Sequence, residues 1–227
     1  MKNFILSIAI FFLLSIESFS HVEHYSKYNY LEYELFRNNE SIGYHKYEFN
    51  RKGEDLSIIS EVSFKITKLG VDLYKYFAKS EENYKSGSFL SYNSKTKQNK
   101  KDRYVNILAN SKNDNLLIDG SSYKGEASKD FIVGTWWNHE IIKAKAQISG
   151  ISGRIIEQTV TFIGKEEIKI GEKTYKTLHF NFKSSDESLP ESKKLNTDIW
   201  YEEGTYLWIK AAFDKTGHWE YRLKKVN

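Results

Sequence analysis

The sequence of 227 residues contains no cysteine and a single proline, Pro190. Without cysteine there are no disulfide bonds and no thiol for lipid attachment, so an exported domain of this kind depends on its hydrophobic core. Scarce proline leaves the hydrogen-bond ladders of β-strands uninterrupted. Nucleophile motifs such as G-x-S-x-G, phosphate-binding glycine loops and metal-ligand spacings are also missing. The sequence therefore predicts no cofactor and favours a non-enzymatic protein over an enzyme.

Aromatic residues make up 15% of the chain, and they suit the half-buried surface of a β-sheet. The formal net charge of +4 comes from an excess of lysine that is spread along the chain. The densest basic run, residues 95–103, lies between two strand-like segments and is interpreted as an exposed hairpin loop. We therefore expect no nucleic-acid partner.

The first 20 residues have the pattern of a secretory signal peptide. Lys2 provides a positive charge, residues 4–16 form an apolar run, and Ser18 and Ser20 supply small residues before a cleavage site at His21. We expect a mature periplasmic chain over residues 21–227, soluble and monomeric, with no transmembrane segment after cleavage. A retained N-terminal anchor is the alternative.

Alternation of apolar and polar residues predicts strands through most of the mature chain. In residues 56–67, for example, Leu56, Ile58, Val62, Phe64 and Ile66 share one face. The other predicted strands cover residues 28–37, 42–50, 69–85, 89–93, 103–110, 116–119, 154–163, 166–170, 175–183, 199–201, 206–213 and 218–226.

Residues 125–147 interrupt this alternation and predict an irregular or short helical crossover at one end of the sheet. Short turns elsewhere favour a single all-β domain over residues 21–227. Its predicted architecture is one curved antiparallel sheet forming a closed or half-open barrel, with a two-sheet β-sandwich as the alternative.

His45 is the first candidate site residue, because it shares a strand face with Tyr47 and Phe49. If that face points inward, the imidazole needs a partner, and Glu81 or Glu82 could supply one. A His45 and Glu82 pair could act as a general acid and base, but structural hydrogen bonding is the favoured role.

Large aromatic side chains provide the other candidates for a binding site. The predicted ligand-binding residues are His45, Tyr47, Glu82, Trp136, Trp137, Trp200 and Tyr201. The rings of Trp136, Trp137, Trp200 and Tyr201 suit a barrel core as well as a pocket. His21 and His24 near the expected mature N-terminus could bind Cu(II) or Ni(II), but such termini are commonly frayed, and no metal site is predicted.

Several motifs occur in an order that resembles an uncharacterised family of exported bacterial proteins, catalogued as a domain of unknown function (DUF6134). They are residues 41–45 (SIGYH), 82–90 (ENYKSGSFL), 135–137 (TWW), 198–201 (DIWY) and 214–217 (DKTG). Tyr84 stands where such proteins usually have tryptophan. The resemblance implies a periplasmic β-rich fold without an established activity, and it adds Gly43 to His45 and Glu82 as residues of interest.

The leading hypothesis is a periplasmic protein that binds or carries a lipid or another apolar or amphipathic ligand in a concave, aromatic-rich face. An enzyme using His45 with Glu82 and an interaction module for envelope proteins are the alternatives.

Overall fold

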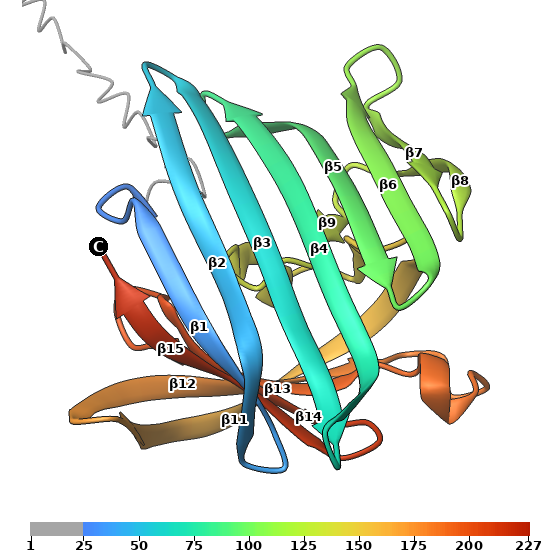
Figure 1. Cartoon of the computed structure of the whole chain (residues 1–227). Coiled ribbons are helices and arrows are strands. Elements are labelled where there is room, and N and C mark those ends of the chain that lie inside the picture. Colours follow the sequence, from blue (N-terminus) through green and yellow to red (C-terminus); the bar gives the residue numbers. More distant parts are fainter. Residues whose placement is uncertain (1–24) are drawn as a thin grey trace, which may run out of the picture.

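The computed structural model describes residues 25–227 as one large, strongly curved sheet of 15 strands (Figure 1). The predicted signal peptide, its predicted cleavage site, His21 and His24 lie outside the described residues. The strands are β1 (Tyr30–Arg37), β2 (Glu40–Lys52), β3 (Asp55–Lys68), β4 (Val71–Lys85), β5 (Ser88–Gln98), β6 (Lys101–Asn110), β7 (Asn115–Gly120), β8 (Lys124–Ser128), β9 (Ile132–Val133), β10 (Ala146–Ile148), β11 (Ile155–Ile170), β12 (Lys173–Ser184), β13 (Asn196–Glu202), β14 (Trp208–Asp214) and β15 (His218–Val226).

Nearly every strand pairs with the next strand in the sequence, as expected for a meander, except that β8 does not pair with β9 and that β9 pairs with β10 in parallel. In addition to β2, β1 pairs with the last strand, β15, and so joins the two halves of the sheet. The sheet is not closed, because its edge strands β8 and β9 do not pair with each other. The half-open barrel is confirmed, and the two-sheet sandwich is not formed.

The predicted crossover is confirmed as irregular, with the short 3-10 helix η2 (His139–Ile142) between β9 and β10. The prediction that it crosses an end of the sheet is wrong. Trp137 is fully buried and its ring lies 5.6 Å from Phe49 of β2 and 5.9 Å from Tyr84 of β4. The segment therefore packs inside the curve, against the concave face, because its tryptophan and isoleucine side chains need apolar surface to cover them.

Three local predictions differ from the structure. Residues 164–165 do not separate two strands, because β11 continues through a bulge between Phe162 and Gly164. The basic run 95–103 is not a loop, since β5 and β6 extend until only Asn99 and Lys100 remain in the turn. Residue 69 does not begin a strand, because Leu69 and Gly70 form the β3–β4 turn. A second 3-10 helix, η3 (Glu191–Lys193), follows Pro190.

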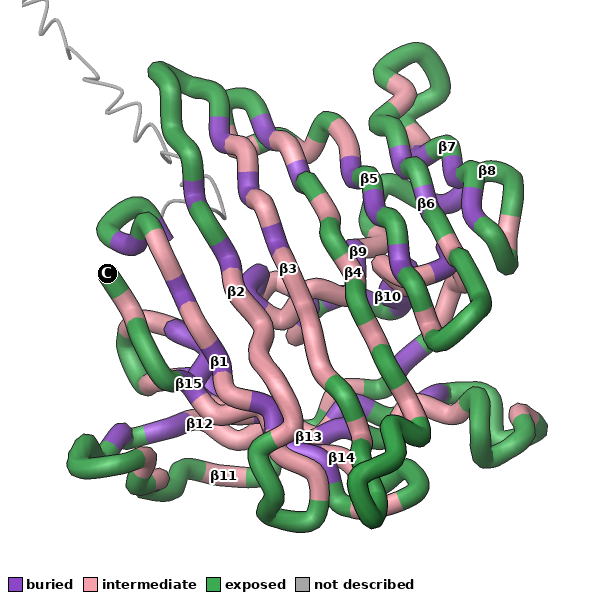
Figure 2. Tube along the Cα trace, in the orientation of Figure 1, coloured by how far each residue is buried: buried purple, intermediate pink, exposed green. Residues whose placement is uncertain are grey.

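Strand alternation places the core on the concave side, as the alternating buried positions in Figure 2 show. Leu31, Tyr33 and Leu35 of β1 are fully buried, and the residues between them are less so. One apolar cluster joins β1, β2, β3 and β13 to β15, and a second joins β5 to β8 with β9 and β10. Phe89 packs against both clusters and so connects them. The strands of both clusters belong to one continuous sheet.

Gly43 allows β2 to come close to its neighbour β3. A Cβ atom at this position would lie 2.1 Å from the backbone oxygen of Ser63. The adjoining register shift between Leu35 and Phe36 of β1 shows that the strands bend here. Any larger residue would push the two backbones apart, which explains a glycine in this otherwise bulky strand.

Across residues 25–227, helices long and apolar enough to span a membrane are not found.

Candidate functional site

A cavity of about 240 Å³ lies on the concave face, between strands β2 to β5 and the crossover. We call it the interior cavity. Its aromatic walls are formed by His45, Tyr47, Tyr76, Tyr92, Trp136 and Tyr221. Its polar groups include Ser60, Ser80, Ser94, Thr135, Gln147 and Ser149. Strand alternation explains this lining, because every second residue of β2 to β5 points to the same face.

Uncharged side chains line the interior cavity throughout. Among residues 25–227, aspartate, glutamate, lysine and arginine are absent from its lining, although charged residues make up 28% of the chain. Outward positions on the same strands, such as Lys79 and Glu81, carry the charge instead. Placing an ion against these walls would remove it from water without supplying a counter-charge, so the cavity disfavours charged groups.

His45 is held in its neutral form. Its Nε2 atom lies 2.8 Å from the hydroxyl oxygen of Ser60, and its ring centre is 4.3 Å from that of Tyr47. The Nδ1 atom is buried and has no hydrogen-bond partner within residues 25–227. Burial lowers the pKa of His45 to about 3, because the charged imidazolium would lose its hydration. At neutral pH, His45 is therefore an uncharged hydrogen-bonding group at the cavity wall.

Glu82 is a buried carboxyl group, 2% exposed, in contact with three neutral donors. The Tyr84 hydroxyl donates a hydrogen bond of 2.5 Å, Trp137 Nε1 donates one of 3.1 Å, and Thr135 Oγ1 donates one of 3.3 Å. Burial raises the pKa of Glu82 to about 7, and the three donors offset part of this rise. Glu82 ties the crossover to β4, since Thr135 and Trp137 both belong to the crossover.

The predicted pairing of His45 with Glu81 or Glu82 is wrong. His45 bonds to Ser60, while Glu81 accepts a hydrogen bond from Ser57 on the outer face. Glu82 lines a separate cavity of about 660 Å³ near β8 and β9. The imidazole and the carboxyl groups are thus directed to different partners, and the structure does not assemble the acid and base pair.

The predicted aromatic residues are divided among three places. Trp136 lines the interior cavity with Tyr47, and its ring centre lies 5.3 Å from that of Tyr221. Trp137 and Tyr201 are fully buried in the core beside it. Trp200 lies on the opposite face of β13 from Tyr201, and its ring stacks on His179 at 4.3 Å between centres. Successive strand residues point to opposite faces, so Trp200 and Tyr201 cannot line one pocket.

Several residues of the interior cavity were not anticipated, among them Ser60, Tyr76, Tyr92 and Gln147. The alternation within β3, β4 and β5 contains the signal for the first three. Nothing local could have identified Gln147, because it reaches the cavity through the packing of the crossover.

A second unanticipated cluster lies on the outer face of β11 to β13. His179 Nδ1 is 2.9 Å from a carboxylate oxygen of Glu166, and its Nε2 atom is 3.0 Å from Asp198. Trp200 Nε1 donates a hydrogen bond of 2.6 Å to Glu166. Even so, no group of three or more acidic, histidine or cysteine side chains within residues 25–227 is arranged to hold a metal ion.

These features define a half-open, β-barrel-like protein with an uncharged interior cavity. The chain belongs to the family described as "Domain of unknown function (DUF6134)", whose model matches residues 33–224. A structural search finds the crystal structure of a β-barrel-like protein of domain of unknown function DUF1849 from Brucella abortus, with a TM-score of 0.58 and 11% sequence identity. The match covers 87% of this chain and 96% of that one, and at this identity it shows a shared fold only. No curated protein matches the sequence.

Proposed function

We propose that this protein binds a small apolar or amphipathic molecule, such as part of a lipid, in the interior cavity. One observation carries the proposal: aromatic rings, hydroxyls and a neutral imidazole surround the cavity without any charged side chain. Apolar walls with a few polar groups are typical of ligand pockets, which usually enclose about 300–1,000 Å³. A volume of about 240 Å³ lies just below that range, so the ligand, or the part of it that enters, is small.

The chemistry of the lining also selects among ligands. The hydroxyls and His45 can exchange hydrogen bonds with an uncharged polar group, whereas an ionised group would remain unpaired. We therefore expect the enclosed part of the ligand to be neutral. Native mass spectrometry of protein purified from its own host can detect a molecule that remains bound. Acid–base catalysis by His45 and Glu82 is not proposed, because the two side chains have separate partners.

Filling the cavity is expected to abolish binding. The Ala78 side chain lines the cavity from β4, and Ala78→Phe would place a phenyl ring in the space that a ligand needs. The affinity for the neutral dye N-phenylnaphthylamine, measured by its fluorescence, should fall by at least about tenfold. This corresponds to a loss of about 1.4 kcal/mol of binding free energy.

Lys79→Phe is the matched control, because Lys79 is the next residue of the same strand and points outward. This variant should bind the dye as the parent does. The charged dye anilinonaphthalene sulfonate should bind more weakly than the neutral dye. Equal binding of the neutral dye by the parent and Ala78→Phe would contradict the proposal.

We also propose that the protein is exported to the periplasm and acts there as a monomer. The basis is the pattern of Lys2, the apolar residues 4–16, and Ser18 and Ser20. N-terminal sequencing of the protein from a periplasmic fraction should begin at His21. Recovery of the intact N-terminus in the cytoplasm would contradict export, and size-exclusion chromatography with light scattering would test the monomer.

A further inference from the structure

The turn between β3 and β4 exposes apolar side chains in a conformation that does not suit them. Leu69 and Gly70 form a two-residue hairpin turn, with φ angles of 51° and 77°. Positive φ at both positions favours asparagine and glycine, and it is unfavourable for leucine. The corresponding β1–β2 turn uses Asn38 and Asn39, with φ angles of 51° and 66°. Leu69 is 95% exposed, so neither the backbone nor burial explains a leucine here.

Two further apolar residues continue this surface along β4. Val71 is 62% exposed and Leu73 is 56% exposed. Together with Leu69 they form what we call the apolar tip. The β3–β4 turn lies at the lower end of the sheet in Figure 1 and is coloured as exposed in Figure 2. The folded chain gains little from these side chains, because they bury little surface in it.

Lysine side chains lie next to the apolar tip and on the neighbouring hairpin. Lys65, Lys68 and Lys75 belong to the β3–β4 hairpin, and Lys97, Lys100 and Lys101 belong to the neighbouring β5–β6 hairpin. The β5–β6 turn is bonded to β4 five residues past the β3–β4 turn, since Asn99 N donates to Lys75 O at 2.8 Å and Lys75 N donates to Asn99 Oδ1 at 2.7 Å. The acidic residues within these two hairpin ends are Asp72, which pairs with Lys75 at 2.9 Å, and Asp102. Six lysines against two aspartates leave residues 65–75 and 97–102 with a net positive charge.

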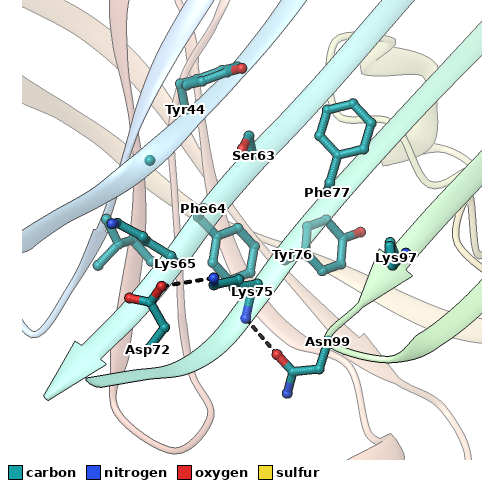
Figure 3. Close-up of a pocket in the computed structure, with 12 residues that line it drawn as sticks. Tyr44, Ser63, Phe64, Lys65, Asp72, Lys75, Tyr76, Phe77, Lys97 and Asn99 are labelled. Atoms are coloured by element: carbon teal, nitrogen blue, oxygen red, sulfur yellow. Dashed lines mark hydrogen bonds and ion pairs between the residues drawn. The ribbon is translucent and has the colours of Figure 1, made fainter. Parts of the chain in front are cut away.

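The surface between these lysines is hollowed into a groove of about 610 Å³ (Figure 3). Lys65, Lys75 and Lys97 line it together with Asp72, which pairs with Lys75. Phe64 and Tyr76, whose rings stack at 4.8 Å between centres, are also among its lining residues. Three amino groups against one carboxylate can accommodate an anionic headgroup.

We propose that the apolar tip docks on a membrane surface that contains anionic lipids. Leu69, Val71 and Leu73 would enter the interface, while the lysines of the two hairpins contact the headgroups. Exposed apolar side chains beside a group of lysines are the combination by which proteins bind such surfaces. A protein partner would require a complementary apolar recess, whereas a lipid interface accepts a narrow protruding tip of this kind.

The groove and the interior cavity share Tyr76, which lines both and lies three residues beyond Leu73 of the tip along β4. Docking would therefore bring the cavity close to a source of amphipathic ligand. The docking inference rests on the tip and its charges, and it does not require the cavity to bind a ligand.

Sedimentation with lipid vesicles tests the inference. The parent protein should bind vesicles of phosphatidylcholine that contain phosphatidylglycerol, and binding should fall with added salt. Leu69→Asn should weaken this binding by about tenfold or more, because a leucine side chain no longer leaves water. Its melting temperature should equal or exceed that of the parent, because asparagine accepts the positive φ. A folding defect cannot produce this combination.

Leu108→Asn is the matched control, since Leu108 is 53% exposed elsewhere on the sheet and should not affect vesicle binding. The cavity variant Ala78→Phe should also bind vesicles normally, which separates docking from ligand binding. Unchanged binding by Leu69→Asn would overturn the inference and assign the exposed leucine to a protein partner. Equal binding to pure phosphatidylcholine would overturn the role of the lysines.

Discussion

Replacing His45 with glutamine is expected to remove an acid-induced loss of stability. Between pH 8 and pH 3, the free energy of unfolding of the parent should fall by about 4 kcal/mol more than that of His45→Gln. The pKa of His45 is about 3 in the folded protein and about 6.5 in an unfolded chain. The folded-state pKa is lowered, so the stability contribution is complete above pH 6.5 and is lost as the pH falls toward 3. The unfolded chain then takes up a proton that the buried ring cannot.

Urea denaturation of both proteins between pH 3 and pH 8, followed by tryptophan fluorescence, measures the effect. Glutamine stays uncharged and can still bond to Ser60, so the difference between the two free energies of unfolding should change across this range. His218→Gln removes an exposed imidazole and serves as the control. If the free energies of unfolding of the parent and His45→Gln changed with pH in the same way, the prediction would be contradicted. Such a result would show that water in the cavity solvates the His45 ring.

Replacing Glu82 with glutamine is expected to have the opposite pH dependence, with an amplitude of about 3 kcal/mol. The pKa of Glu82 is raised from 4.5 to about 7 by burial. Stability is therefore complete below pH 4.5 and is lost as the pH rises through 7, because the folded protein must then bury a carboxylate. A shift of about 2.5 units corresponds to about 3 kcal/mol. The glutamine oxygen can still accept the hydrogen bond from Trp137.

The measurement is the free energy of unfolding of the parent and Glu82→Gln between pH 4 and pH 8. Relative to the parent, the variant should gain stability across this range. Glu81→Gln is the matched control, because Glu81 is adjacent in the chain but exposed on the outer face. If Glu81→Gln showed the same gain, the effect would reflect overall charge and not the burial of Glu82.

The two titrations oppose each other between pH 4.5 and pH 6.5. His45 stabilises the parent as the pH rises through this interval, and Glu82 destabilises it. The pH profile of the parent alone can therefore look flat while both groups act. Only the differences between the parent and each variant separate them.

Neither the family nor the shared fold assigns a function. Both the DUF6134 family and the structurally similar DUF1849 protein are described as of unknown function. The proposals therefore depend on two physical features of this chain: an interior cavity without charged walls among the described residues, and an exposed apolar tip with lysines beside it.

Strand positions and faces could be predicted from the sequence because they depend on neighbouring residues. Alternation identified the buried face of β1, with Leu31, Tyr33 and Leu35, and of β3, with Leu56 and Ile58. It also put His45 and Tyr47 on one shared face, which the structure shows to be the concave face. Asparagine and glycine in the turns account for the short hairpins that make the chain a meander.

Contacts between distant segments could only be found in the tertiary structure. The pairing of β1 with β15 joins residues nearly a chain length apart, and the crossover packs inside the curve through Trp137. The choice of Ser60 as the partner of His45, and of Trp137, Tyr84 and Thr135 as the partners of Glu82, follows from that packing. The alternation of residues in a strand indicates which face each residue occupies, because the backbone geometry of a strand is local. This alternation contains no information about which other part of the chain packs against that face.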